Sequence, residues 1–599
     1  MKLHRIDTQS VLLYFLLQFL LAFLLLLLTQ GLFWWVNQGL FLPGGGWRIL
    51  LGNLHFGLSG TAYALLPFAL MMAIPIRRRW WDIASRCGLG LGVAFLLAAN
   101  VADIPYFQWT LRRTAGDIFA YLGQNFDGGL LIGQMLKDFW PYFLLFFLLY
   151  ALWIVAQLHL RLTPGRNRWW VGLILLALNV TCIRGGWILQ HKPLAPVDAS
   201  RYAPAQNQAL VLNTPFSILR TLGNTASVKP VHYFEDEELE QIFNPIHTNN
   251  QQPKTKNHNV VVLILESFSE EYIGAINQGG RSWTPFLDSL SAHCLLFQGR
   301  ANGKRSIESL PALFLGIPSL MDEAYITSTF SQNRTLSLPQ ILARHGYTSA
   351  FFHGAYNGSM NFDAFCQQIG FDRYYGMDQY PSREDFDGTW GIFDEPFLRW
   401  SATELATLPQ PFFATLYTIS SHHPYTIPPQ HKGRFPKGEI PLLETIGYTD
   451  YALRRFFAEA ARQPWFDSTL FVITADHAAQ PLSDYYRANA YCVPMLLYSP
   501  GLTPERRDQL FQHIDLMPTL LDLLGLPDSC LSFGHSALCG EGYHVARPGS
   551  YYIMERAGEQ LTFDGERFAP EEGPEENRRF LKALLQQYNN RMIENRLLP

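Results

Sequence analysis

Residues with acid, base or metal-binding chemistry directly follow several short apolar runs of this chain. Glu266 follows "VVVLIL", His353 follows "SAFF", His422 follows "FFATLYTISS", and Asp476 with His477 follows "LFVIT". Carboxylate and imidazole groups together form a ligand set that suits Mn²⁺, Zn²⁺ or Mg²⁺. The pattern indicates one metal site assembled from distant segments, although each residue alone is compatible with an ordinary loop position.

Ser306 is the candidate nucleophile, in the stretch "ANGKRSIESLPALF". A serine oxygen that binds the same ion has a lowered pKa, so it can attack a phosphorus centre at neutral pH. A helix that begins here also presents free N–H groups to an anion. Three alternatives stay open: a plain helix N-cap at Ser306, a solvated pair at Lys304 and Arg305 instead of a phosphate contact, and a purely capping Glu308.

The apolar runs that precede these residues predict the fold that must position them. They are short and β-rich, and helix-sized segments separate them; they are Val260–Leu265, Ser349–Phe352, Phe412–Thr418, Leu470–Thr474 and Val493–Tyr498. Continuous apolar strands that alternate with helices are typical of a mainly parallel sheet with both faces covered. Ligands of such sheets bind beyond the carboxyl ends of the strands, where the candidate residues stand.

The first third of the chain has a different composition. Five apolar segments are candidate membrane spans: Ser10–Val36, Phe56–Ile76, Ala84–Val101, Phe139–Ala156 and Trp169–Trp187. A span needs about 20 apolar residues, and the first segment is uncharged and long enough. It is too long for the apolar part of a signal peptide.

Basic residues predict the orientation of these spans, because cytoplasmic loops are richer in lysine and arginine. They stand before the first span, after the second and after the fourth, as Lys2 and Arg5, as Arg77 to Arg79, and as Arg161, Arg166 and Arg168. We therefore expect a cytoplasmic N-terminus. Five crossings then place everything after the fifth span in the periplasm or outside the cell.

Four parts are expected along the 599 residues: a transmembrane domain (1–189), a linker with juxtamembrane helices (190–256), an α/β domain (257–556) and a helical C-terminal tail (557–599). The formal net charge of −4 gives no indication of a nucleic-acid partner. Cys530 and Cys539 lie close together in sequence and could form a disulfide in an oxidising compartment.

Five motifs occur in a fixed order: "LESF", "GKRSIESLPAL", "SSHHPY", "TADH" and "HIDLMPTLLDLLG". Together they resemble the lipoteichoic acid synthase family, part of the sulfatase and alkaline-phosphatase-like superfamily. The resemblance extends over the whole architecture. It implies an N-terminal five-helix transmembrane domain and an extracytoplasmic sulfatase-like α/β domain with a mainly parallel sheet covered by helices.

The resemblance also implies a metal site and a nucleophile. Glu266, Ser306, Asp476 and His477 match the residues that hold one divalent metal, commonly manganese, with zinc and magnesium as alternatives. Ser306 stands where the family usually has a threonine nucleophile. The exchange keeps a hydroxyl group, so the chemistry is preserved.

Substrate contacts are implied at three further positions. His422 matches a histidine that binds or protonates the phosphoglycerol group, and His353 matches one at the pocket edge. Asn361 is flanked by Met360 and Phe362, whereas the family usually has tryptophan and arginine there. Without that arginine a bidentate phosphate ligand is lost, so either the basic pair before the nucleophile replaces it or the head group differs.

The implied reaction is two-step phosphoryl transfer at the bacterial plasma membrane. A phospholipid such as phosphatidylglycerol donates phosphoglycerol to Ser306 and releases diacylglycerol. The group then passes to a hydroxyl of a glycan or polyol-phosphate acceptor. Positioning and charge neutralisation dominate such catalysis. The sequence predicts neither the acceptor nor the oligomeric state.

Three other functions are compatible with parts of the pattern. A phosphoethanolamine transferase shares the superfamily, but such proteins generally have a threonine nucleophile and several disulfides. A true sulfatase would carry C/S-x-P-x-R, whereas Ser306 is followed by "IESL". A catalytically silent sulfatase-like envelope protein also remains open at this point.

Overall fold

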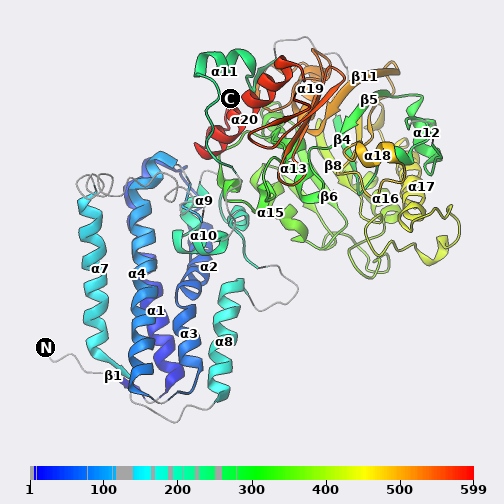
Figure 1. Ribbon diagram of the computed structural model, residues 1–599. Helices are drawn as coiled ribbons and strands as arrows, with labels where there is room; N and C mark the ends of the chain where they lie inside the picture. The colour runs from blue at the N-terminus through cyan, green and yellow to red at the C-terminus, as the bar shows by residue number, and fades with distance from the viewer. Residues whose placement is uncertain are drawn as a thin grey trace. The chain divides into compact units, whose positions relative to one another are not determined.

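A computed structural model of the chain contains two compact units (Figure 1). The first comprises Met1–Ser227 and Thr327–Asn333, and the second comprises Val228–Ile326 and Arg334–Pro599. The structure describes residues 6–8, 10–76, 78–110, 112–116, 139–162, 169–186, 193–204, 207–222, 228–249, 259–277, 280–571 and 573–599. The expected domain boundaries at 189–190 and 256–257 lie outside the described residues, as do Lys2, Arg5, Arg77, Arg166 and Arg168.

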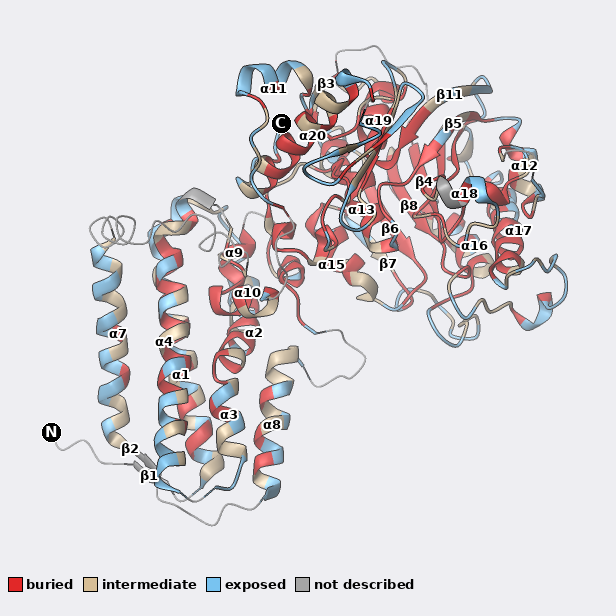
Figure 2. Ribbon diagram, in the orientation of Figure 1, coloured by how far each residue is buried: buried red, intermediate tan, exposed pale blue. Residues whose placement is uncertain are grey.

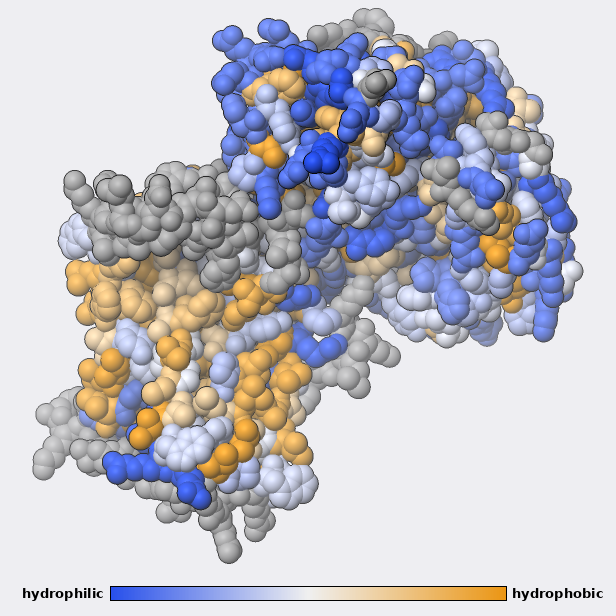
Figure 3. Space-filling view, in the orientation of Figure 1, coloured by the Kyte–Doolittle hydropathy of each residue, from blue (hydrophilic) through white to orange (hydrophobic). Residues whose placement is uncertain are grey.

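The first unit is a bundle of apolar helices, whose outer surface is largely hydrophobic in Figure 3. Large apolar side chains such as Leu24, Leu148 and Leu173 are more than half exposed on it. This distribution suits lipid as the surrounding medium rather than water. The helices are α1 (Val11–Asn37), α2 (Gly46–Ala64), α3 (Leu66–Ala73), α4 (Arg79–Thr110), α7 (Trp140–His159) and α8 (Trp169–Arg184).

Three described helices, α1, α4 and α7, are long and apolar enough to cross a membrane, and the pair α2 and α3 makes a fourth candidate if it is one broken span. The pair bends by 59°, because Pro67 cannot donate the backbone hydrogen bond that a continuous helix requires. The prediction of five spans is therefore confirmed only in part. The fifth segment, α8, has 16 residues and ends at Gly185 and Gly186, which both adopt positive φ.

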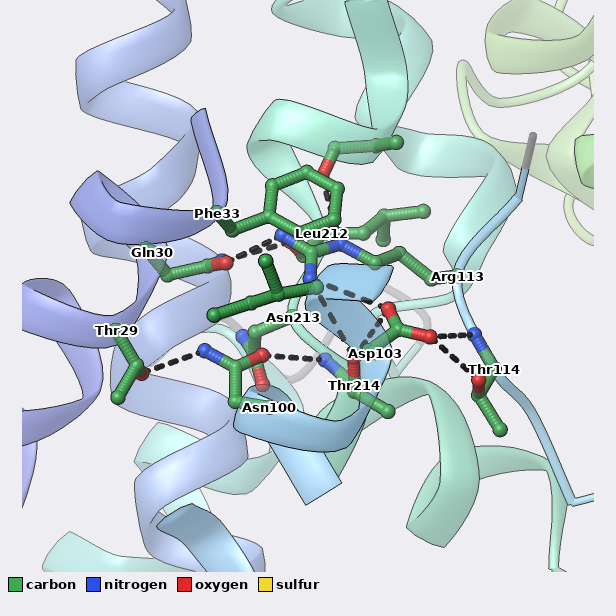
Figure 4. Close-up of polar contacts among 12 residues, drawn as sticks. Thr29, Gln30, Phe33, Asn100, Asp103, Arg113, Thr114, Leu212, Asn213 and Thr214 are labelled. Atoms are coloured by element: carbon green, nitrogen blue, oxygen red, sulfur yellow. Dashed lines mark hydrogen bonds and ion pairs between the residues drawn. The ribbon is translucent and has the colours of Figure 1, made fainter. Parts of the chain in front are cut away.

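A buried ion pair lies inside this unit, where α4 meets two short helices, α9 (Gln208–Val211) and α10 (Thr214–Thr221). The guanidinium of Arg113 lies 3.2 Å from the carboxylate of Asp103, and both side chains are fully buried (Figure 4). The same guanidinium covers the ring of Phe33 at 3.4 Å and donates to the carbonyl of Ala209 and the amide oxygen of Gln30.

Neutral hydrogen bonds extend the cluster across three helices. Thr214 Oγ1 donates to Asp103 at 2.7 Å, and the Thr214 backbone N–H donates to Asn100 Oδ1 at 3.2 Å. Asn100 Nδ2 in turn donates to Thr29 Oγ1 of α1 at 2.7 Å (Figure 4). Because buried polar groups are costly unless paired, these bonds hold α1, α4 and α10 in one arrangement.

The second unit is built on an eight-stranded sheet in the order β11-β5-β10-β9-β4-β8-β6-β7. All five apolar runs of the sequence are strands of this sheet, and the prediction of a mainly parallel sheet is confirmed. Strand β10 is the exception, since it runs antiparallel to both neighbours. The strands are β4 (Asn259–Leu265), β5 (Leu295–Arg300), β6 (Thr348–His353), β7 (Arg373–Tyr375), β8 (Phe412–Tyr417), β9 (Thr469–Ala475), β10 (Met495–Tyr498) and β11 (Glu505–Gln512).

Helices cover both faces of this sheet, as the buried strands in Figure 2 indicate. Phe412 packs on Trp465 with ring centroids 5.7 Å apart, whereas the next residue, Phe413, packs on Phe314 at 5.9 Å. Successive strand residues point to opposite faces, so these contacts belong to two different layers. Helices of the two layers include α13 (Ser306–Leu315), α16 (Asp394–Leu405) and α17 (Leu442–Ala460).

Smaller elements complete the second unit. A four-stranded antiparallel sheet is formed by β13 (Tyr543–Ala546), β14 (Tyr552–Arg556), β15 (Glu559–Phe563) and β16 (Phe568–Ala569). The tail predicted to be helical over 557–599 is helical only from Glu575, because β15 and β16 of this sheet occupy its first part. The C-terminal helix α20 (Glu575–Ile593) buries Leu581, Leu584 and Tyr588 against the unit. Cys530 is buried, Cys539 is exposed, and no disulfide joins them, so the pairing considered from the sequence does not occur here.

We expect the substitution Arg113→Met to destabilise the helical unit by about 3–5 kcal/mol, because it leaves the Asp103 carboxylate buried without its partner. The apparent Tm of the full chain in detergent should fall by several degrees. The double variant Arg113→Met/Asp103→Leu should lose much less, and Arg48→Met, at an exposed base of the same unit, should leave Tm unchanged. Equal Tm values for Arg113→Met and the wild type would contradict a stabilising role of the ion pair.

Candidate active site

Two neighbouring parallel strands, β4 and β9, bring the candidate metal ligands together. Strand β4 pairs with β8 on one side and with β9 on the other. Glu266 directly follows β4, while Asp476 and His477 directly follow β9. Carboxyl ends of adjacent parallel strands meet at one edge of the sheet, so residues about 210 positions apart in the chain become neighbours.

Ligand atoms of Glu266, Asp476 and His477 all lie within 4.8 Å of one another. His477 Nε2 lies 3.4 Å from Asp476 Oδ2 and 3.9 Å from Glu266 Oε1. Ser306 Oγ lies 3.3 Å from Glu266 Oε2 and 3.4 Å from His477 Nε2. The four predicted residues therefore converge on one small volume.

Donor spacing in this group suits a small divalent cation. Four donors around a tetrahedral ion at about 2.1 Å lie roughly 3.4 Å from one another. The contacts of His477 and Ser306 given above, at 3.3–3.9 Å, are close to this spacing, and the three candidate ligands together lie within 4.8 Å of one another. Glu266 and Asp476 are 3% and 1% exposed. Within the described residues, no lysine or arginine forms an ion pair with either carboxylate. His477 is the one basic side chain among the described residues within ion-pair distance of these carboxylates, and a divalent ion would balance their buried negative charge.

The pKa of Glu266 is affected by the same concentration of buried negative charge. Burial raises the pKa of its carboxyl, and the neighbouring charge of Asp476 raises it further. Burial likewise raises the pKa of Tyr417, so its phenol stays neutral and donates a hydrogen bond to Asp476 Oδ2 at 2.7 Å. Tyr417 is therefore an orienting partner of a candidate ligand.

Backbone geometry fixes the other carboxylate oxygen of Asp476. The backbone N–H groups of Ser267 and His477 both donate to Asp476 Oδ1 at 2.8 Å. Ser267 adopts φ = 62°, a left-handed conformation that is unfavourable for a residue with a side chain. Its hydroxyl donates to Glu266 Oε1 at 2.8 Å, so this strained residue connects both carboxylates.

Helix α13 begins at Ser306, with Arg305 as the N-cap residue, so the serine is the first helical residue rather than the cap. Glu308 closes the helix start: its Oε2 accepts from the backbone N–H groups of Lys304 and Arg305 at 2.8 and 3.0 Å. Gly303 makes this possible, because a Cβ there would lie 2.6 Å from Glu308 Oε2. Glu308 therefore caps its own helix, which is one of the interpretations that the sequence left open.

The basic pair before Ser306 is engaged within the protein. The Arg305 guanidinium contacts Glu308 Oε1 at 2.6 Å. Lys304 Nζ donates to the carbonyl of Ala490 at 2.6 Å and lies 4.8 Å from the ring centroid of Tyr491. Both side chains remain accessible to solvent, but a phosphate contact would require them to exchange these partners.

His422 lies in the loop after β8 and is partly exposed. Its ring centroid lies 4.2 Å from that of Trp390, whose indole N–H donates to the carbonyl of His423. Trp390 is 39% exposed. Sequence reasoning missed Trp390, since an isolated tryptophan in a loop carries no pattern. Its contact holds the His422 ring in one orientation at the same edge of the sheet.

Two of the predicted substrate contacts are buried. His353, at the end of β6, is 1% exposed, and its ring packs on Phe362 and Tyr417 at centroid distances of 5.4 and 5.0 Å. It thus lies behind a residue that orients Asp476, rather than at a pocket edge, because the apolar strand continues through it. Asn361 is 8% exposed, with φ = 59°.

His513 is a further buried histidine that the sequence placed in a motif without a role. Burial lowers its pKa to about 4, despite the opposing charge of Asp476, so the imidazole is neutral. Together with Tyr417 and Ser267 it belongs to the surroundings of the candidate ligands. The sequence pattern predicted a site role for none of these three residues, because Tyr417 is typical of a strand residue and Ser267 of a turn residue.

Comparison with known proteins supports a common fold. The Sulfatase family model matches residues 258–526. Two curated relatives from Bacillus subtilis are the lipoteichoic acid synthase-like protein YvgJ, 25% identical over 56% of this chain and 60% of the relative, and lipoteichoic acid synthase 1, 29% identical over 45% and 46%. The chain spans about half the length of the curated relatives it matches.

Two solved structures share the architecture of the second unit. An alkaline phosphatase superfamily protein from Vibrio parahaemolyticus has a TM-score of 0.55 and 22% identity, covering 61% of this chain and 97% of that protein. Lipoteichoic acid synthase LtaP from Listeria monocytogenes has a TM-score of 0.50 and 21% identity over 61% and 98%. These similarities concern the fold.

The variant Tyr417→Phe should weaken divalent-metal binding by about 10–100-fold, because Asp476 loses the hydrogen bond that orients it. Titration of the purified full chain with Mn²⁺, followed by calorimetry, measures this change. Tyr588→Phe, at a buried tyrosine of α20, is the matched control and should bind like the wild type. Unchanged affinity in Tyr417→Phe would exclude an orienting role for the phenol.

Proposed function

We propose that this chain, which matches the Sulfatase family model over residues 258–526 and is similar to curated lipoteichoic acid synthases, transfers phosphoglycerol from phosphatidylglycerol to a glycan or polyol-phosphate acceptor. The observation that carries this proposal is the convergence of Ser306 with Glu266, Asp476 and His477, with Ser306 Oγ 3.3–3.5 Å from its neighbours. A hydroxyl group beside two buried carboxylates and an imidazole adds little to the stability of the fold, so its position favours a catalytic role.

Ser306 is the proposed nucleophile. Its Oγ attacks the phosphorus of the donor, a new Oγ–P bond forms, and the bond from phosphorus to the glycerol oxygen of diacylglycerol breaks. Oγ releases its proton to solvent, and the diacylglycerol oxygen leaves with a proton, for which His422 is the proposed donor. In the second step an acceptor hydroxyl attacks the same phosphorus and gives its proton to His422, the Oγ–P bond breaks, and Oγ takes a proton from solvent, which regenerates Ser306 and protonated His422.

The remaining residues prepare this hydroxyl. A divalent cation, proposed to be Mn²⁺, would be held by Glu266, Ser306, Asp476 and His477 and would supply the positive charge that favours an ionised Oγ and a bound phosphate. Tyr417 and the backbone N–H of Ser267 keep Asp476 oriented. Because α13 begins at Ser306, the free backbone N–H groups of its first turn favour a phosphate bound next to the nucleophile.

Membrane attachment fits a lipid donor. The apolar helices of the first unit are long enough for several spans, and we propose that they anchor the chain in the bacterial plasma membrane with the second unit on the periplasmic or external side. Phosphatidylglycerol is preferred over phosphatidylethanolamine as donor because the curated relatives described above are lipoteichoic acid synthases and a lipoteichoic acid synthase-like protein. Met360 and Phe362 flank Asn361 in place of the tryptophan and arginine usual in the family, so the identity of the lipid head group is the point to test.

Head-group release tests the nucleophile. Full chain in detergent should release the head group of a fluorescent phosphatidylglycerol and form diacylglycerol. Ser306→Ala should lower this rate by roughly 10³-fold or more, whereas Ser306→Thr should retain measurable activity because it keeps a hydroxyl. The control Ser401→Ala changes a buried serine of α16 that bonds to a backbone carbonyl.

Three results would contradict the assignment. Full activity of Ser306→Ala would remove the nucleophile, and faster turnover of the matching phosphatidylethanolamine would favour a phosphoethanolamine transferase. A wild-type chain that consumes neither lipid and binds no metal would favour a silent envelope protein.

Metal removal tests the ligand set separately. Treatment with EDTA should abolish head-group release, and Mn²⁺ should restore it, with Zn²⁺ and Mg²⁺ compared in parallel. Elemental analysis should find one bound ion per wild-type chain and a strongly reduced content in Glu266→Gln, because one charged ligand is lost. Full activity after EDTA treatment, or undiminished metal in Glu266→Gln, would exclude this site.

A further inference from the structure

A groove of about 600 Å³ lies in the first unit, between the C-terminal half of α1 and the N-terminal half of α2. Its lining is mainly apolar and includes Leu27, Trp34, Phe41, Ile49 and Leu50. The volume falls within the range of about 300–1,000 Å³ typical of small-molecule sites. We propose that this α1–α2 groove binds one acyl chain and the adjoining glycerol-ester region of a diacyl phospholipid.

Tryptophan side chains indicate the depth of the groove in a membrane. Trp34, Trp35 and Trp47, at this end of the unit, are 52%, 63% and 68% exposed. At the opposite ends of the helices, Trp80 and Trp169 are 58% and 70% exposed. Exposed tryptophans gather at the two membrane–water interfaces, so the groove extends inward from one interface. That depth is where the ester groups and upper acyl chains of phospholipids lie.

The groove also lies at the end of the unit from which the chain continues toward the second unit. His55 of α2 hydrogen-bonds to the carbonyl of Gly185, just beyond α8, at 2.7 Å. Residues 208–212 then pack at this same end, where Leu210 lines the groove. The groove therefore opens to the lipid leaflet at the end of the helical unit where the chain leaves α8.

Two amide side chains form a fixed polar part of the groove wall. Gln30 Nε2 donates to the carbonyl of Leu212 at 2.7 Å, and its Oε1 accepts from the buried Arg113 (Figure 4). Asn53 Nδ2 donates to the carbonyl of Leu210 at 2.9 Å. Their positions are set by the protein before a ligand arrives, which reduces the entropy lost on binding. Amide groups beside an apolar channel match lipid esters beside an acyl chain.

The absence of a side chain at Gly31 keeps the groove open. Gly31 lines it, and a Cβ built at this position meets nothing within 4 Å. A neighbouring helix of a second copy is a less suitable occupant, because membrane helices associate through close stripes of small residues. This wall instead presents Leu27, Trp34 and Leu50 around a concave space.

This inference rests on the proposed function for the identity of the lipid, since the donor is phosphatidylglycerol. The variant Gly31→Leu fills the groove without a backbone penalty, because leucine is a better helix former than glycine. Gly39→Leu is the matched control: Gly39, in the turn Gln38–Leu40, also has open space at its Cβ and does not line the groove.

The experiment uses the full chain in nanodiscs of phosphatidylcholine with added phosphatidylglycerol that carries a photoreactive diazirine on one acyl chain. Peptide mapping after illumination should locate the label on residues 27–53 in the wild type and in Gly39→Leu, and this label should largely disappear in Gly31→Leu. In parallel, turnover of phosphatidylglycerol is compared with turnover of the water-soluble diester bis-p-nitrophenyl phosphate. The ratio of the two rates should fall about tenfold in Gly31→Leu, which corresponds to the loss of apolar contacts by roughly two methylene groups of the lipid.

The possible outcomes separate this inference from the proposed function. Labelling spread evenly over exposed helices such as α7, or equal in Gly31→Leu and the wild type, would overturn the groove as a lipid site. Cross-links between two copies through residues 27–53 would assign it to self-association instead. If the wild type consumes no phosphatidylglycerol, the transferase proposal fails, while the labelling pattern still decides whether the groove binds lipid.

Discussion

Two buried carboxylates side by side constrain the whole catalytic unit. Glu266 and Asp476 lie at the carboxyl ends of adjacent strands, almost fully buried, and their mutual repulsion contributes to the raised pKa of Glu266. Such a pair is unfavourable unless a cation balances it. The sheet must therefore be rigid enough to hold the two groups together, and its apolar core on both faces supplies that rigidity.

Much of the surrounding structure consists of groups that orient these carboxylates. Ser267 adopts an unfavourable backbone conformation, in which its backbone N–H donates to Asp476 and its hydroxyl donates to Glu266. Tyr417 contributes its phenol from the end of β8, and His353 supports the Tyr417 ring from β6. One layer of side chains behind the ligands thus connects four strands, so that Ser306 meets a preformed group of donors.

The helical unit follows a related principle in a different medium. There the ion pair of Arg113 with Asp103 is buried among helices whose outer surface is apolar. Its hydrogen-bond partners include Gln30, which also lines the α1–α2 groove. In both units, then, polar groups surround buried charge, and those groups define the geometry of a neighbouring site.

The sequence alone determined the strands, the apolar helices and the four residues at the centre of the site, because apolar runs and strand-end positions are local properties that topology converts into proximity. Other features depended on contacts between distant residues, which no local pattern encodes. These features include Tyr417 as a partner of Asp476, Trp390 against His422, the burial of His353, and the engagement of Arg305 by Glu308. The short α8 and the broken α2–α3 pair differ from these, because local residues account for them: Gly185 and Gly186 follow α8, and Pro67 interrupts the α2–α3 pair.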